Sequence, residues 1–327
     1  MSELVSVVMA TYNGERYITT QIESILNQSY LNLELIVVDD ASTDKTKSIL
    51  QELAIRDKRI KIVLSSKNIG FVANFERGLK LAEGEFIALS DQDDVFRNDK
   101  IQVMVNALKN NEVDLVISDV KLIDEKDVVI SESMWKPQYR NPNDRHPFRR
   151  IIHSNYATGC SMMIKRKLLK YALPFPNNCM VHDWWLAVVA SSSNSGGIMQ
   201  IYDTLTSYRQ HDMNTIGANK RSDISIAKNC KILFNKNKES ERCRIRNTGI
   251  NNHIMRVEGY LLLEIWEDKE RLILKKYLKL LRSYQEDFST NLLTRISNIP
   301  GRLYYSYLTR NSREGLEVLY FSLFPKK

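Results

Sequence analysis

The sequence predicts an α/β fold, with a mostly parallel sheet covered by helices on both faces and a helical extension at the C-terminal end. Short apolar segments rich in Val and Ile alternate with segments of helical spacing through the first part of the chain. Such alternation implies right-handed crossovers between parallel strands. From about residue 219 onward, long segments of helical spacing replace this alternation.

The expected elements follow one another in chain order. Apolar runs that stop at polar turns are typical of buried parallel strands, and they occur at residues 4–10, 33–39, 60–64 and 86–89. Apolar residues at helical intervals predict helices over residues 15–28, 44–55, 71–82 and 100–110. The same patterns further along predict strands at 115–118, 156–164 and 198–208, a loop at 131–147, and helices at 183–191 and 255–284.

A domain boundary is expected near Ala218, between an α/β domain (residues 1–218) and a basic helical region (residues 219–327). The chain has 327 residues and a net charge of +8. Residues 1–218 carry 25 basic and 27 acidic side chains, whereas residues 219–327 carry 22 and 12. The excess positive charge therefore lies in the second region, where it could meet nucleic acid, an anionic membrane surface or an acidic substrate.

The composition excludes several classes of protein. With 43% hydrophobic residues, 12 Gly and 7 Pro, the chain can bury a core and is neither low-complexity nor collagen-like. Its four cysteines show no zinc-site or disulfide spacing and are expected to be thiols in a reducing cytosol. No segment approaches the ~18 apolar residues of a spanning helix, and the N-terminus lacks a secretory pattern. We expect a cytoplasmic protein, or one peripheral to a membrane.

Polar residues follow each of the first predicted strands. They are Thr11 to Asn13, Asp39 to Asp44, Asn68 with Gly70, and Asp91 to Asp94. Ligands of open parallel sheets bind beyond the carboxyl ends of the strands, so these turns form the candidate site. Asp44 precedes a predicted helix and is interpreted as a helix cap. The succession of such turns nevertheless indicates a binding site.

Asp91, Asp93 and Asp94 would repel one another in a partly buried cleft unless a cation lay among them. An Asp-x-Asp pair after an apolar strand offers two oxygen ligands on one side of a turn. Such ligands suit Mg²⁺ or Mn²⁺, which in turn bridges phosphate oxygens. The sequence leaves open which of the three carboxylates contact the metal.

Four segments taken together resemble the family 2 glycosyltransferases of the GT-A fold, which are inverting enzymes that use nucleotide-diphosphate sugars. They are SVVMATYNGERYI, ELIVVDDASTDKT, NIGFVANFERGLKLAEGEFIALSDQDD and VHDWWLA, and they span about the first two thirds of the chain. The forms SDQDDVF, HDWWLAVVAS and YRQHDMNTIGA are most similar to bacterial rhamnosyltransferases of the streptococcal type, which build cell-wall or surface polysaccharides. The resemblance implies a Rossmann-like GT-A domain followed by a variable extension.

The resemblance also implies roles for individual residues. Contacts with the nucleotide fall to Thr11, Tyr12, Glu15, Asp40 and Asn68. Asp91 and Asp93 match the DxD pair, Asp183 matches the catalytic base, and His211 matches a histidine that completes the metal or diphosphate site in some relatives. The chain departs from the commonest pattern in carrying DQDD, with an additional carboxylate.

Physical chemistry agrees with these roles. Displacement at an anomeric carbon needs a base on the acceptor hydroxyl and neutralisation of the departing diphosphate. Desolvation by Trp184 and Trp185 would raise the proton affinity of Asp183, whose alternative role is a helix N-cap. Either indole could pack on an acceptor sugar, although at least one is expected in the core. Arg209, two residues before His211, is a candidate diphosphate contact.

The expected activity is transfer of L-rhamnose from dTDP-L-rhamnose to a lipid-linked saccharide, with Mn²⁺ or Mg²⁺ as cofactor. A UDP-hexose donor, for glucosyl or galactosyl transfer, is an alternative because a few pocket contacts decide sugar selectivity. The basic region, with the apolar Leu316 to Phe324 near its end, is expected to dock on the anionic inner face of the bacterial cell membrane or to contact a second subunit. Nucleic-acid binding by this region is the alternative from another class.

Overall fold

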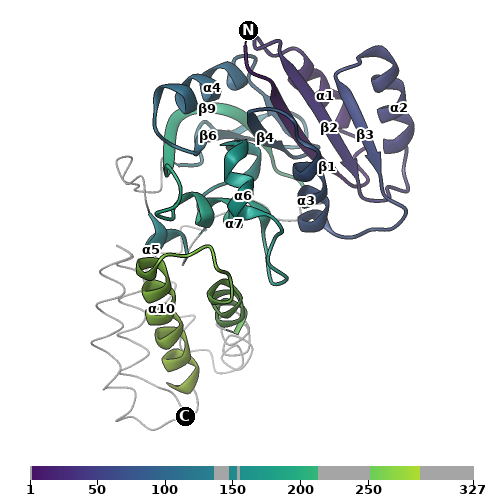
Figure 1. Ribbon diagram of the computed structural model, residues 1–327. Helices are drawn as coiled ribbons and strands as arrows, with labels where there is room; N and C mark the ends of the chain where they lie inside the picture. The colour runs from purple at the N-terminus through teal and green to yellow at the C-terminus, as the bar shows by residue number, and fades with distance from the viewer. Residues whose placement is uncertain (1, 136–146, 153–154, 213–250, 288–327) are drawn as a thin grey trace, which may run out of the picture. The chain divides into compact units, whose positions relative to one another are not determined.

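The computed structural model describes residues 2–135, 147–152, 155–212 and 251–287. The chain divides into two compact units, one of residues 1–175 and 179–217 and the other of residues 176–178 and 218–327 (Figure 1). The expected boundary at Ala218 and the apolar segment from Leu316 to Phe324 lie outside the described residues. Both stay predictions.

A mixed sheet forms the first unit. The strand order in its described part is β3-β2-β1-β4-β8-β6-β9-β5, and β7 pairs with β6 beside this path. Pairing is parallel among β1, β2, β3 and β4 and between β6 and β9, whereas β8 and β5 run antiparallel to their neighbours. The strands are β1 (Val5–Thr11), β2 (Leu33–Asp39), β3 (Ile60–Leu64), β4 (Phe86–Ser90), β5 (Val95–Phe96), β6 (Leu115–Ile123), β7 (Val129–Ser131), β8 (Met162–Lys165) and β9 (Ile198–Arg209).

Helices cover both faces of this sheet (Figure 1). The helical elements of the first unit are α1 (Ile18–Leu26), α2 (Thr46–Arg56), α3 (Phe71–Leu81), α4 (Lys100–Asn110), α5 (Phe148–Ile151), η1 (Gly159–Ser161), η2 (Arg166–Leu168), α6 (Leu169–Ala172) and α7 (His182–Ala190). Apolar residues of α1, α2 and α4 pack in one core with alternate residues of β1 and β2. The predicted α/β class with a mostly parallel sheet is confirmed.

Helix α3 covers the opposite face and approaches it closely at Gly78. A Cβ on Gly78 would lie 2.5 Å from Val8 Cγ1 and 2.9 Å from Val38 Cγ2. A larger residue would push the helix away from the sheet, so glycine permits this packing. Because α7 in turn contacts α3, the position of α3 bears on residues at the start of α7.

The predicted strand at 156–164 is wrong over most of its length. The 3₁₀ turn η1 occupies Gly159–Ser161, and regular pairing begins at Met162. Cys160 is fully buried, and Tyr156 and Ala157 are nearly so. Their apolar pattern reflected burial of a turn rather than a strand, and periodicity cannot separate the two over so short a segment.

The single helix predicted at 255–284 is also wrong, because the described part of the second unit holds two helices there. One covers residues 251–261, and α10 covers Asp268–Asp287. The Trp266 indole donates to the Tyr260 carbonyl (2.6 Å), and the Arg271 guanidinium donates to the Leu263 carbonyl (3.1 Å). The first bond satisfies a carbonyl at the end of the first helix, and the second satisfies a carbonyl of the turn that follows it. In the described residues, no helix combines the length and the apolar character needed to cross a membrane.

Candidate active site

Three strands of the sheet end at the same edge. In β1 and β2, which run in register, Thr11 pairs with Asp39, and β4 lies parallel on the other side of β1 and ends at Ser90. The turns that follow begin at Tyr12, Asp40 and Asp91. The structure therefore brings together the polar turns that the sequence singled out.

Gln92 joins two of these turns, a role that the sequence analysis did not foresee. The Thr11 hydroxyl donates to Gln92 Oε1 (2.6 Å), and the Tyr12 amide donates to the same oxygen (2.9 Å). In return, Gln92 Nε2 donates to the Tyr12 carbonyl (3.1 Å). The Tyr12 ring remains 46% exposed beside this junction, so it presents a free aromatic face.

Asp40 organises the loop that contains Asn68. Its carboxylate accepts the amides of Ile69 (2.8 Å) and Gly70 (2.9 Å), and Asn68 Oδ1 also accepts the Gly70 amide (3.1 Å). Gly70 has φ +86°, which glycine adopts without strain. Asp40 is 3% exposed, and each of its oxygens keeps a lone pair for a further donor.

Glu15 and Asp44 serve the start of α2. Glu15 Oε2 accepts the Lys45 amide (2.9 Å), and Asp44 Oδ1 accepts the Thr46 amide (2.9 Å). The amide of Glu15 donates to Asp44 Oδ2 (3.1 Å), which links the turn after β1 to the turn after β2. Amide groups at a helix start are satisfied in this way, although the N-cap residue of α2 is Lys45 and not the expected Asp44.

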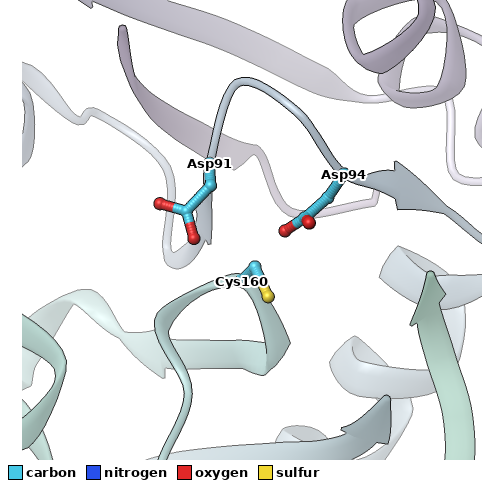
Figure 2. Close-up of side chains that lie close together, drawn as sticks. All are labelled: Asp91, Asp94 and Cys160. Atoms are coloured by element: carbon cyan, nitrogen blue, oxygen red, sulfur yellow. The ribbon is translucent and has the colours of Figure 1, made fainter. Parts of the chain in front are cut away.

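The loop after β4 carries an acidic cluster. One oxygen each of Asp91 and Asp94 and the Cys160 sulfur all lie within 4.8 Å of one another. Figure 2 shows the two carboxylates pointing from the two ends of the loop toward Cys160 in η1. Asp93, by contrast, pairs with His211 (2.8 Å), so the carboxylates that converge are not the expected Asp91 and Asp93.

Burial and mutual repulsion govern the charge of this cluster. Burial, together with the charges of Asp94, Asp93 and Asp183, raises the pKa of Asp91 well above its usual range. Burial and the charge of Asp93 raise the pKa of Asp94 to about 7. Asp183 is connected to this cluster through η1, because the Gly159 amide donates to Asp183 and the next residue, Cys160, lies beside Asp91 and Asp94.

These residues fit a divalent cation. Asp94 Oδ2 is buried and has no hydrogen-bond partner in the part of the chain that the structure describes. Two convergent carboxylates with raised pKa values favour a bound cation or a proton. Burial and the acidic neighbours raise the pKa of the Cys160 thiol, so it stays protonated and is unsuited to act as a thiolate ligand.

Lys100 is a buried cation beneath the cluster, and no motif pointed to it. It is fully buried at the start of α4, where its ammonium donates to the Cys160 carbonyl and to Thr206 Oγ1 (2.9 Å) and lies 3.3 Å from the Phe96 ring centre. Burial lowers the pKa of Lys100 to about 7, while Asp94 and Asp91 act in the opposite direction. Because Cys160 and Thr206 are far from Lys100 in the sequence, no local motif indicates that Lys100 belongs to the site.

Arg209 is buried and holds several parts of the site together. Its amide donates to Asp94 Oδ1 (3.1 Å), and its Nε donates to the Asp93 carbonyl (2.8 Å). The guanidinium also pairs with Asp127 (2.8 Å) and lies over the Tyr17 ring. His211 also stacks on the Tyr17 ring, with ring centres 5.2 Å apart. Arg209 therefore fixes the acidic loop through its hydrogen bonds to Asp93 and Asp94.

Asp183 lies in the first turn of α7, and the helix cap is Val181, so Asp183 is not the N-cap. Asn155 Nδ2 donates to its Oδ1 (2.9 Å), and the Gly159 amide donates to its Oδ2 (2.8 Å). Burial raises the pKa of Asp183 to about 6, against the lowering effect of these hydrogen bonds. A carboxylate with this pKa can accept a proton near neutral pH.

The two indoles beside Asp183 differ. Trp185 is 1% exposed, and its Nε1 donates to the Ala172 carbonyl (2.8 Å), which places it in the core and corrects its expected acceptor contact. Trp184 is half-buried and donates through Nε1 to the Ile151 carbonyl. Trp184 therefore remains as the candidate acceptor contact.

Comparison with known proteins supplies the family. Residues 6–172 match the model described as glycosyl transferase family 2. An "uncharacterized glycosyltransferase" of Haemophilus influenzae is 32% identical over 285 residues, which are 84% of this chain and 84% of the relative. The dTDP-rhamnosyl transferase RfbG of Shigella flexneri is 28% identical over 84% of this chain and 98% of its own. The Escherichia coli UDP-Glc:alpha-D-GlcNAc-diphosphoundecaprenol beta-1,3-glucosyltransferase WfgD is 29% identical over 59% of this chain and 72% of its own.

Solved structures agree on the fold. S. aureus TarS 1-349 in complex with UDP-GlcNAc matches with a TM-score of 0.58 and 17% identity, over 98% of this chain and 90% of that one. The family match extends from β1 past β8 and includes the polar turns and the acidic loop. With that match and a relative of 32% identity along most of its length, the chain belongs to glycosyltransferase family 2.

Proposed function

We propose that the chain is an inverting, cation-dependent transferase that moves L-rhamnose from dTDP-L-rhamnose to a lipid-linked saccharide in bacterial polysaccharide synthesis. The observation that carries the proposal is that η1 connects Asp183, which accepts the Gly159 amide, to the acidic cluster of Asp91 and Asp94, which Cys160 contacts. Asp183 can accept a proton, and the carboxylates of Asp91 and Asp94 can bind a cation. Transfer of a glycosyl group from a diphosphate needs both.

Asp183 is the proposed base. It removes the proton of the acceptor hydroxyl while the oxygen forms a bond to the anomeric carbon and the bond to the diphosphate breaks. A single displacement of this kind inverts the anomeric configuration. The bonds from Asn155 and Gly159 fix both carboxylate oxygens, so the base is oriented before the acceptor arrives.

Asp91 and Asp94 are the proposed cation ligands, with the pair of Asp93 and His211 beside them. A Mn²⁺ or Mg²⁺ ion bound there would neutralise charge on the departing diphosphate. Arg209 contributes by fixing the loop through Asp93 and Asp94. We infer a positioning role for it rather than direct contact with the diphosphate.

The turns after β1, β2 and β3 are the proposed nucleotide site. Tyr12 offers an exposed ring on which a base can stack, and Thr11 is fixed by Gln92 next to it. Asp40 and Asn68 hold the loop at Gly70, and Glu15 holds the start of α2. We infer that these five residues form the nucleotide site, Tyr12 through its ring and the others partly through the backbone that they hold.

The donor assignment rests on the relatives. The Shigella flexneri relative, matched over nearly its whole length, carries dTDP-rhamnosyl transfer in its name. A UDP-glucose donor is the second candidate, since the Escherichia coli relative of similar identity is named for that donor. Calorimetry and hydrolysis assays with dTDP-L-rhamnose, UDP-glucose, UDP-galactose and UDP-GlcNAc, each with Mn²⁺ and with EDTA, test both points. Hydrolysis of UDP-glucose but not of dTDP-L-rhamnose would overturn the rhamnosyl assignment alone.

The second unit is the proposed membrane-binding part. Helix α10 buries Leu274, Tyr277 and Leu281 on one side and exposes lysines on another, at 269, 275, 276 and 279. Exposed cations on an amphipathic helix are attracted to anionic lipid headgroups. An acceptor carried on a lipid would then be presented to the active site at the membrane surface.

A further inference from the structure

Gln92 lies inside the acidic loop but contacts the turn after β1. Its amide group makes three hydrogen bonds to Thr11 and Tyr12, which are 81 and 80 residues away in the chain. On either side of it in the loop are Asp91 and Asp94, the proposed cation ligands. One loop therefore carries the proposed cation ligands and touches the proposed nucleotide site.

These three bonds suit a glutamine in particular. The Tyr12 amide can only donate and the Tyr12 carbonyl can only accept, so Oε1 of Gln92 must face the amide and Nε2 the carbonyl. Both lone pairs of Oε1 are used, because the Thr11 hydroxyl donates to the same atom. A glutamate would accept the same two bonds, but it could not donate to the Tyr12 carbonyl, and it would add negative charge to the loop.

Gly14 leaves room for the Gln92 side chain. A Cβ on Gly14 would lie 2.5 Å from Gln92 Oε1 and 3.0 Å from Thr11 Oγ1. The amide of Gly14 donates to Thr46 Oγ1 (2.8 Å), which fixes the backbone at this point. Because φ of Gly14 is not positive, alanine is compatible with the backbone here. Its methyl group would instead displace Gln92 from the turn.

A bound cation would act on Gln92 through the loop. Figure 2 shows Asp91 and Asp94 at the two ends of the loop, with their carboxylates directed toward each other's side of Cys160. Two negative charges at this separation repel one another, and a cation bound by both would hold the two ends together. Good hydrogen bonds span a donor–acceptor range of only about 0.5 Å, so the three bonds of Gln92 are most favourable when the loop is fixed.

We propose that Gln92 is a positioning residue that couples the cation site to the nucleoside site. With a cation bound, Gln92 holds the backbone of Tyr12, whose exposed ring is then presented to the base of the nucleotide. The same bonds reach the turn after β2, because the Thr11 carbonyl accepts the Asp40 amide (2.9 Å). The ligand is the nucleoside part of a nucleotide-diphosphate sugar. The proposal rests on the proposed function, since it takes both sites from there.

A free nucleoside isolates this coupling, because it has no phosphate through which to contact the cation directly. In the full chain, Gln92→Met keeps the length of the side chain but removes all three bonds. Gly14→Ala displaces Gln92 while leaving it intact, and so gives a second test if Gln92→Met lowers the melting temperature. Gln51→Met, at an exposed position on α2, is the matched control.

Saturation-transfer NMR measures the affinity for thymidine, and in parallel for uridine, with diamagnetic Mg²⁺ and with EDTA. In the wild type, we expect Mg²⁺ to tighten nucleoside binding by about fivefold or more, and the nucleoside to tighten Mg²⁺ binding by the same factor. In Gln92→Met and Gly14→Ala, nucleoside affinity in Mg²⁺ should fall to the value that the wild type shows in EDTA. Gln51→Met should behave as the wild type. In turnover, Gln92→Met should raise the donor KM by a larger factor than it lowers kcat.

Two results would overturn the inference alone. One is nucleoside binding by the wild type that is equal in Mg²⁺ and in EDTA although dTDP or UDP binds. The other is a loss of nucleoside affinity in Gln92→Met that is equal in Mg²⁺ and in EDTA, which would make Gln92 a structural residue of the turn. If the wild type binds neither dTDP nor UDP in the presence of Mn²⁺, the proposed function itself fails, so the two failures are distinguishable.

Discussion

The amide of Gly159 lies 2.8 Å from Asp183 Oδ2 and donates a hydrogen bond to it, although 23 residues separate the two in the chain. The next residue, Cys160, places its sulfur in the acidic cluster, and its carbonyl accepts a hydrogen bond from Lys100. The 3₁₀ turn η1 thus connects the proposed base, the proposed cation site and a buried ammonium. A disturbance at any of these points is expected to reach the others through η1.

Asp183→Asn is expected to abolish transfer while leaving donor binding nearly intact. The amide keeps the shape of the side chain but cannot accept the acceptor proton, and loss of a general base costs ~10²–10⁴ in rate. Turnover of the identified donor and its calorimetric affinity are the measurements. Asp203→Asn, at an exposed position on β9, is the control. Wild-type turnover by Asp183→Asn would leave Asp183 a structural residue of the first turn of α7.

The pH dependence of the rate follows from the same carboxylate. Burial raises the pKa of Asp183 to about 6, so the base becomes protonated and inactive as the pH falls through this value. We expect log(kcat/KM) to be flat above pH about 7 and to fall by roughly one unit for each pH unit below 6. A rate profile from pH 4.5 to 8.5, with the melting temperature recorded in each buffer, checks this. A profile that stays flat down to pH 5 would contradict a base with a raised pKa.

Asp94→Asn tests the cation site through stability. Because its pKa is raised to about 7, the folded protein binds a proton there more tightly than the unfolded chain does. Without a cation, stability should therefore fall as the pH rises from about 4 toward 7. Mn²⁺ at pH 7.5 should raise the wild-type melting temperature by about 2–4 °C or more. Asp94→Asn should have a higher melting temperature than the wild type in the absence of a cation, and Mn²⁺ should not raise it further.

Asp93→Ala separates the converging carboxylates from the one that pairs with His211. We expect it to weaken Mn²⁺ and donor binding as well, since it removes charge next to the cluster, but less than Asp94→Asn does. Calorimetric titration of Mn²⁺ into both variants measures the difference. Equal donor affinity in Mn²⁺ and in EDTA for the wild type would instead indicate a mechanism without a cation.

Local patterns predicted the parallel half of the sheet well. The observed bounds of β1 to β4 and of α1 to α4 lie within about three residues of the predicted ones, because each element has a clear apolar period and ends at a polar turn. Polar strand ends likewise pointed to the site, since parallel strands must bring them to one edge.

Other features depend on contacts distant in sequence and could not be foreseen. Lys100 and Gln92 look like ordinary polar residues until tertiary structure brings Cys160 and Tyr12 to them. The break before α10 contains neither Gly nor Pro, and bonds from Trp266 and Arg271 satisfy carbonyls of the helix end and of the turn after it. That Asp94 rather than Asp93 joins Asp91 depends on how His211 approaches from β9.

Membrane binding can be tested on the described part of the second unit. Lys275, Lys276 and Lys279 are exposed near one another on α10, whereas the first 218 residues carry no excess of positive charge. We expect the full chain to sediment with phosphatidylglycerol liposomes at low salt and to be partly released at high salt, where the surface potential is screened. Replacing these three lysines by Gln should weaken binding by several-fold to over a hundredfold, since each exposed cation contributes on the order of 1 kcal/mol.

The control for that experiment replaces Lys58, Lys126 and Lys170, three exposed lysines of the first unit, by Gln, so that the total change in charge is equal. If both triple variants bind alike, attraction depends on net charge and not on α10.

Truncation after residue 310 tests the expected contribution of Leu316 to Phe324, and it should slow transfer to a lipid-linked acceptor more than transfer to a soluble one. The alternative is that these apolar residues pack within the protein or against a second copy. In that case the truncated chain would be unstable or change its oligomeric state, and the intact protein would not bind liposomes at any salt concentration. Duplex DNA in the same salt series distinguishes lipid from nucleic acid, because a strong mobility shift with no liposome binding would favour the nucleic-acid role for the basic region.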